Sequence, residues 1–130
     1  MAQTVAIPGR RVSSGETFRT DWTPRGGDCA ILRVEVLIAE GGGKAITFAL
    51  ETRGEDGTTV TTMTPKSPAG GLELTSTGVA TCLYLATDAT TAGNGAQEQV
   101  RVVVSCTSDS GGYYVVRIFP LIFIDSAREY

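Results

Sequence analysis

The chain contains no histidine, and it has only three cysteines and one tryptophan. Without histidine, Ser–His–Asp and Cys–His catalytic centres are excluded, and there is no G-x-S-x-G motif. Cys29, Cys82 and Cys106 lie in separate apolar runs, without the short Cys and His spacings of a zinc site. We therefore expect no catalytic residue, no metal site and no cofactor. We expect buried, reduced cysteines, although the spacing also allows one disulfide.

Long apolar runs and a strong net charge are missing as well. No stretch reaches the roughly 18 apolar residues that cross a bilayer, and the start "MAQTVAIPGRR" lacks the apolar centre of a secretion signal. The net charge of −3 argues against nucleic-acid binding, which normally needs a basic surface. We expect a protein made in a cytoplasm that binds neither membranes nor nucleic acid.

The first 27 residues differ from this acidic average, because they carry more positive than negative side chains. Their charged residues are Arg10, Arg11, Glu16, Arg19, Asp21 and Arg25. We interpret this excess as a solvated surface; phosphate binding is the alternative. It could also contribute to docking on an acidic protein surface.

No segment has helical periodicity, and short alternating runs are present instead. Apolar and polar residues alternate in "CAILRVEVLIAE" (29–40), "AITFALETR" (45–53) and "VRVVVSCTS" (100–108). Turns rich in glycine separate these runs, so we predict a hairpin of 29–40 with 45–53 and another of 100–108 with the last strand. The loops 65–71 and 88–99 are expected to be irregular and to face solvent.

This pattern predicts an all-β fold: a single-domain antiparallel β-sandwich, jelly-roll-like, with about eight strands. An up-and-down barrel is the other all-β architecture that fits. An immunoglobulin-like topology has less support, because Trp22 precedes the first cysteine. We expect residues 1–12 to form an N-terminal arm or first strand, and residues 13–130 to form the sandwich.

The sequence contains two kinds of candidate site, a group of carboxylates and a pair of aromatic residues. Glu51, Glu55 and Asp56 could act as an acid–base pair on a glycoside, but "ETRGEDG" is typical of a hairpin turn, so we expect no enzyme. Trp22 and Tyr113 are candidate ligand residues of a carbohydrate-binding surface. A carbohydrate-binding β-sandwich module is therefore the alternative function.

The last strand, residues 113–124, has apolar residues on both faces and only Arg117 is charged. One face can point into the core, and the other needs a cover, such as a second subunit or the segment "TVAIPG" of the same chain. Pro120 predicts an edge, a bulge or a bend. The expected interface residues are Tyr114, Val116, Ile118, Phe119, Leu121 and Phe123 of this strand, with Val5 and Ile7 of the N-terminal segment.

The stretches "TFRTDW", "LRVEVLIAEGGGKAITFALETRGEDGTTVTTM" and "YYVVRIFPLIFIDSA" resemble small β-sandwich virion proteins of tailed bacteriophages. The resemblance implies a head decoration (cement) protein or a minor structural protein of the virion. It implies no catalytic residues, a homo-oligomer with a trimer favoured, and the major capsid protein or another virion protein as partner. The expected location is the virion.

Overall fold

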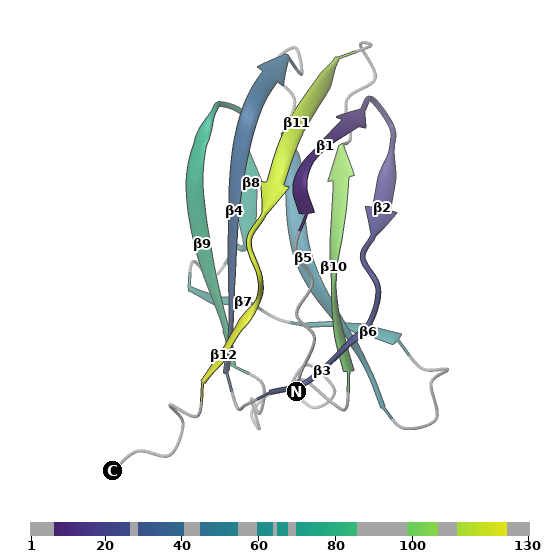
Figure 1. Cartoon of the computed structure of the whole chain (residues 1–130), viewed down its shortest axis with the longest axis vertical. Coiled ribbons are helices and arrows are strands. Elements are labelled where there is room, and N and C mark those ends of the chain that lie inside the picture. The colour runs from purple at the N-terminus through teal and green to yellow at the C-terminus, as the bar shows by residue number, and fades with distance from the viewer. Residues whose placement is uncertain are drawn as a thin grey trace.

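The structure, a computed structural model, describes residues 7–26, 29–40, 45–54, 60–63, 65–67, 70–85, 99–106 and 112–124. This part of the chain contains strands and no helix, and hence no helix that could cross a membrane (Figure 1). The strands are β1 (Ile7–Ser13), β2 (Thr17–Arg19), β3 (Thr23–Pro24), β4 (Cys29–Glu40), β5 (Ile46–Arg53), β6 (Val60–Thr62), β7 (Pro65–Ser67), β8 (Leu72–Leu74), β9 (Gly78–Leu85), β10 (Gln99–Cys106), β11 (Tyr113–Ile118) and β12 (Ile122–Ile124).

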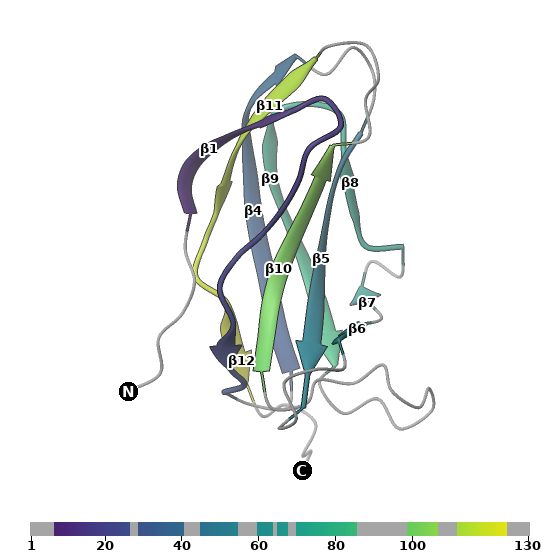
Figure 2. The ribbon, with the colours of Figure 1, turned by 90° about the vertical axis from the view of Figure 1, so that its right-hand side faces the viewer.

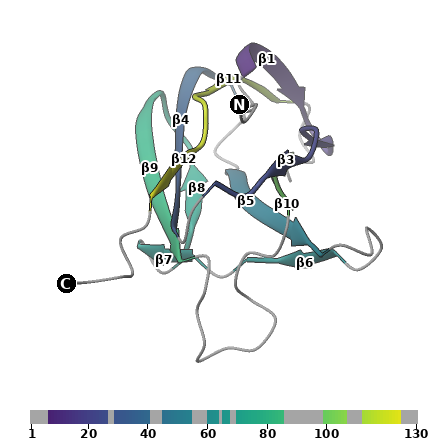
Figure 3. The ribbon, with the colours of Figure 1, turned by 60° about the horizontal axis from the view of Figure 1, so that its bottom comes forward.

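The strands form two antiparallel sheets that pack face to face (Figures 2 and 3). Sheet A has the order β1-β11-β4-β9-β7, with β12 also paired to β4. Sheet B has the order β2-β10-β5-β6, with β3 beside β10 and β8 beside β5. Apart from the steps β2 to β3, β5 to β6 and β11 to β12, each strand is followed along the chain by a strand of the opposite sheet. This order is that of a jelly roll, so the predicted sandwich is confirmed.

Both predicted hairpins are wrong. β4 and β5 lie in different sheets, where β4 pairs with β9 and β5 pairs with β10. β10 and β11 are separated in the same way. Alternation shows only that a strand buries one face. The same pattern arises whether the next strand of the chain is its hairpin neighbour or lies in the opposite sheet, across the core. The turn signal after residue 53 does join neighbours, because Arg53 of β5 pairs with Val60 of β6.

The core lies between the two sheets and is built from the inward face of each long strand. Its members include Leu32, Val34 and Val36 of β4, Ile46, Phe48 and Leu50 of β5, and Val100, Val102 and Val104 of β10. Each such side chain contributes about 1.5–3 kcal/mol when it is fully buried. The three cysteines are buried and none forms a disulfide. Burial raises the pKa of the Cys82 thiol, which keeps it protonated.

The edges of sheet A correct a further expectation. Residues 65–67, predicted to be irregular, form the short strand β7 beside β9. Proline is compatible with the first position of an edge strand, because no ladder hydrogen bond is required from it there. Most of the predicted loop 88–99 lies outside the described residues, as does Val5. β1 forms the opposite edge of sheet A, and Ile7, its first residue, is half-buried against the core.

Candidate functional surfaces

The inward face of the last strand belongs to the core of the chain itself. Tyr114, Val116 and Ile118 of β11 have 0–1% of their surface exposed, and Leu121 has 3%. Side chains enclosed between the sheets cannot contact a second folded copy, so the interface prediction is wrong for these four residues. Both faces of this strand are apolar in sequence, and the alternation alone did not indicate which face would turn inward.

The outward face of β11 is covered in part by arginines of the same chain. The Arg11 guanidinium lies 4.2 Å from the centroid of the Tyr113 ring. The guanidinium groups of Arg33 and Arg117 lie 4.7 and 4.5 Å from that of Phe119. Tyr113, predicted as a ligand residue, and Phe119, predicted as an interface residue, are therefore half-buried beneath cationic groups.

Pro120 marks a bend, and the chain then returns to the same neighbour. β12 pairs with the beginning of β4, while β11 pairs with its end. Phe123 of β12 stands opposite Ala30 and packs against the core. This predicted interface residue is thus half-buried, and its ring lies against Gly26.

The outer face of sheet A carries a concentration of exposed apolar side chains. Ile122 of β12, Ile31 of β4 and Leu83 of β9 form a row across three strands. Val79 of β9 lies further along, opposite Glu35. The large apolar side chains that are exposed on sheet A are Leu37, Ile38, Val79, Ile122 and Ile124. Among the described residues, sheet B exposes only Val60 in this class. We call the outward residues of sheet A the apolar face.

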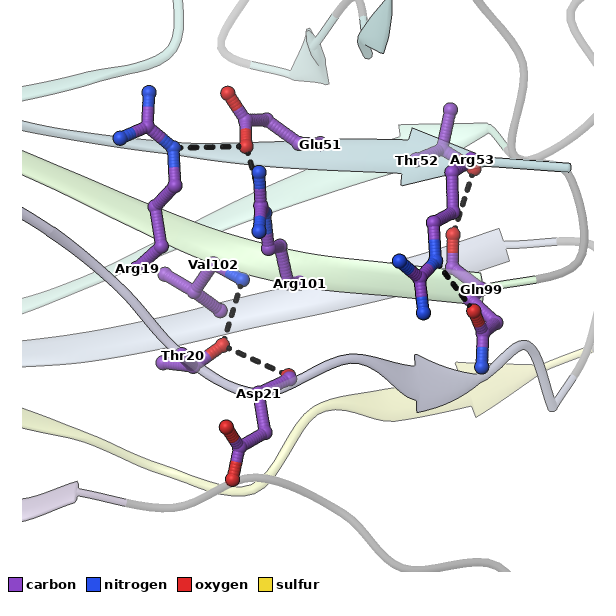
Figure 4. A network of polar contacts seen from close by, with 9 residues as sticks. All are labelled: Arg19, Thr20, Asp21, Glu51, Thr52, Arg53, Gln99, Arg101 and Val102. Carbon is purple, nitrogen blue, oxygen red and sulfur yellow. Dashed lines mark hydrogen bonds and ion pairs between the residues drawn. The ribbon is translucent and has the colours of Figure 1, made fainter. Parts of the chain in front are cut away.

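The outer face of sheet B has a different chemistry, dominated by arginine (Figure 4). On β10 and β5, Gln99 pairs with Arg53 and Arg101 pairs with Glu51, while the alternate residues of both strands point into the core. The Nε atoms of Arg19 and Arg101 both donate to Oε1 of Glu51, at 3.2 and 2.8 Å. The Nε atom of Arg53 donates to Oε1 of Gln99 at 2.6 Å. Glu51, one of the predicted acid–base candidates, therefore serves here as the counterion of two arginines.

Trp22 completes this group. The guanidinium groups of Arg101 and Arg53 lie 4.2 and 4.5 Å from the centroid of its ring. We call the six residues Arg19, Trp22, Glu51, Arg53, Gln99 and Arg101 the Trp22 cluster. It holds three positive charges and one negative charge, although the chain as a whole has a net charge of −3. A sequence search could find Trp22 and Arg19, but Arg53 and Arg101 reach them only through the register of β5 and β10.

Hydrogen bonds that join Thr20 and Thr52 to the backbone of β10 hold the cluster in place. The Val102 N–H donates to the Thr20 hydroxyl at 3.0 Å, and the Thr20 N–H donates to the Val102 carbonyl at 3.0 Å. The Thr52 hydroxyl donates to the Gln99 carbonyl at 2.8 Å. Figure 4 shows the contacts made by the Thr20 and Thr52 hydroxyls. Five of the six cluster residues thus stand on paired strands, which position side chains more tightly than loops do, and Trp22 lies in the connection between β2 and β3.

A metal-binding group is absent from the described part of the chain, where no three Cys, Asp or Glu residues gather closely enough to hold an ion. Glu55 and Asp56 lie outside the described residues.

Comparison with known proteins assigns no family. No family model matches the sequence, and no curated protein matches it. One solved structure that resembles the chain is a family GH115 4-O-methyl-α-glucuronidase with specificity for decorated arabinogalactans, at 12% identity and a TM-score of 0.45. The alignment covers 95% of this chain and 16% of that one, so the chain spans a small part of its length. A likeness this weak supports no statement about activity.

Proposed function

We propose that the protein is a non-enzymatic structural protein that associates with copies of itself through the apolar face of sheet A and docks on a larger particle. A capsid decoration protein or a minor virion protein has this role. The observation that carries the proposal is the position of the exposed apolar side chains, because five of the six in the described residues belong to sheet A. Apolar patches of this kind usually mark interfaces.

The size of the apolar face supports a specific contact. Strands lie about 4.8 Å apart and rise about 3.3 Å per residue, so the six strands of sheet A, which are 3 to 12 residues long, span roughly 600 Å². The smallest specific protein interfaces bury about this area on each partner. Both signs of charge occur on the face, for example on Glu35 and Arg117, which lie 3.5 Å apart. A surface with both signs can pair with a copy of itself.

Light scattering on purified protein tests self-association. We expect the wild type to have the mass of an oligomer, and the variants Val79→Glu and Ile122→Glu to shift it towards the monomer. Both residues are 50% exposed, so the change places a charge on the surface and leaves the core intact. Val60→Glu is the matched control, because Val60 is 43% exposed and lies on sheet B. The measured mass also separates a dimer from the trimer that the resemblance favours.

Two results would overturn the proposal. One is a wild type that stays monomeric at every concentration measured. The other is an equal loss of mass in the Val60→Glu control, since that would separate self-association from sheet A. Carbohydrate binding, the alternative function, has less support, because guanidinium groups already lie against the rings of Trp22 and Tyr113.

A further inference from the structure

Docking on a larger particle requires a surface that recognises the particle. If the apolar face is buried between copies of the chain, this surface must lie elsewhere on the sandwich. We propose that the Trp22 cluster is the docking point, and that its partner is a protein surface with clustered carboxylates. This inference rests on the proposed docking function and names the partner's chemistry. It uses the face of the sandwich opposite to the apolar face.

The three guanidinium groups are held in a way that leaves their outer ends available. Arg19, Arg53 and Arg101 each donate through Nε. Among the described residues their hydrogen bonds all run through Nε and none through a terminal nitrogen, as the dashed lines in Figure 4 show. The terminal nitrogens of a guanidinium form a planar fork that matches a carboxylate with two parallel hydrogen bonds.

These arginines are also ordered before any partner arrives. Glu51 is only 8% exposed and draws Arg19 and Arg101 to the same oxygen atom. The Trp22 ring holds Arg101 and Arg53 from another side. Side chains that are fixed in advance lose less conformational entropy on binding, so the contacts contribute more to affinity.

The composition of the cluster favours a protein partner over a glycan. Tryptophan and arginine are the residues most enriched among those that dominate protein–protein binding energy. A sugar platform would need an open aromatic ring, whereas the Trp22 ring already contacts two guanidinium groups. The excess of positive charge in an otherwise acidic chain selects a negative partner surface.

The test measures binding of fluorescently labelled poly-L-glutamate by anisotropy, at low and at physiological salt. We expect the double variant Arg19→Gln/Arg53→Gln to bind about tenfold or more weakly than the wild type. The matched control is Arg11→Gln/Arg33→Gln, which removes the same charge from sheet A and should bind within about twofold of the wild type. Arg19→Gln alone leaves the Arg101–Glu51 pair intact, so it reports binding if the double variant folds poorly.

Three outcomes would overturn the inference. Equal losses in the two double variants would mean that only net charge matters. Tighter, cluster-dependent binding of polygalacturonate or heparin than of poly-L-glutamate would assign the cluster to acidic glycans. A lower solution mass of the cluster variant would make a second copy of this chain the partner. Self-association is measured separately by light scattering. A wild type that is a monomer and still binds poly-L-glutamate through the cluster would refute self-association and leave the docking inference standing.

Discussion

Glu51 is the residue on which the charged face of sheet B depends. Its carboxylate is almost enclosed and is the shared counterion of Arg19 and Arg101. Glu51→Gln keeps the shape and removes the charge, which leaves two arginines side by side without their counterion. We expect a loss of about 1–3 kcal/mol in the free energy of unfolding, measured by urea denaturation. Glu73→Gln, at an exposed position of β8, should change it by less than about 0.5 kcal/mol, and similar losses in both variants would refute this role of Glu51.

Glu16 gives a second residue-scale prediction, which depends on pH. Its Oε1 accepts a hydrogen bond from the Ser13 N–H at 3.0 Å, and its Oε2 accepts one from Arg10 at 2.6 Å. These two contacts lower the pKa of Glu16 in the folded protein, the backbone hydrogen bond most. In the unfolded chain the pKa returns to about 4.3. The contribution to stability is therefore present above that pH and is lost as the pH falls through the lower, folded pKa.

The variant Glu16→Gln should consequently melt at a lower temperature than the wild type at pH 7, by a small margin because the pair is solvent-accessible. The two melting curves should converge in acid, once the wild-type carboxylate is protonated. A difference in melting temperature that stays constant from neutral to acid pH would show that the charge of Glu16 makes no contribution.

Among the structural elements, β12 is held to the rest of the sandwich in part by the packing of Phe123 against Gly26. A Cβ atom at Gly26 would lie 3.1 Å from the Phe123 side chain, which packs against the core, so Gly26→Ala requires that side chain to shift by a few tenths of an ångström. We expect a loss of about 1–3 kcal/mol in unfolding free energy, the usual effect of overpacking. Gly70→Ala is the control, since a Cβ there meets nothing within 4 Å.

A double-mutant cycle tests the cause. In a Phe123→Ala background the ring is gone, so Gly26→Ala should then have little effect. If the alanine destabilises both backgrounds equally, crowding against Phe123 is not the reason for the loss.

The whole molecule separates two chemistries on opposite sides of one sandwich. Sheet A presents apolar side chains outward, and sheet B presents arginines around a tryptophan. If copies bury their apolar faces against one another, the Trp22 clusters stay on the outside of the assembly. Several copies of a weak charged contact would then act together, which raises the strength of attachment far above that of one contact.

Much of this protein follows from its sequence alone. Alternation in 29–40, 45–53 and 100–108 determined the all-β class, because each strand must bury one face. It also indicated which residues form most of the core, and the apolar surroundings of Cys29, Cys82 and Cys106 indicated their burial. The basic N-terminal stretch contains Arg19, which the structure places beside Glu51.

Only the tertiary structure decided which neighbours these strands have. Alternation indicates which face of a strand is buried, but not which strand lies beside it in the sheet or across the core. For this reason the two predicted hairpins are wrong, and in each case the two strands lie in different sheets. The same ambiguity hid which face of residues 113–124 turns inward. The Trp22 cluster depends on register as well, because it joins Arg19, Glu51 and Arg101 from three strands far apart in the chain. Local sequence specifies a strand's faces, whereas contacts between strands are set by how all of them pack together.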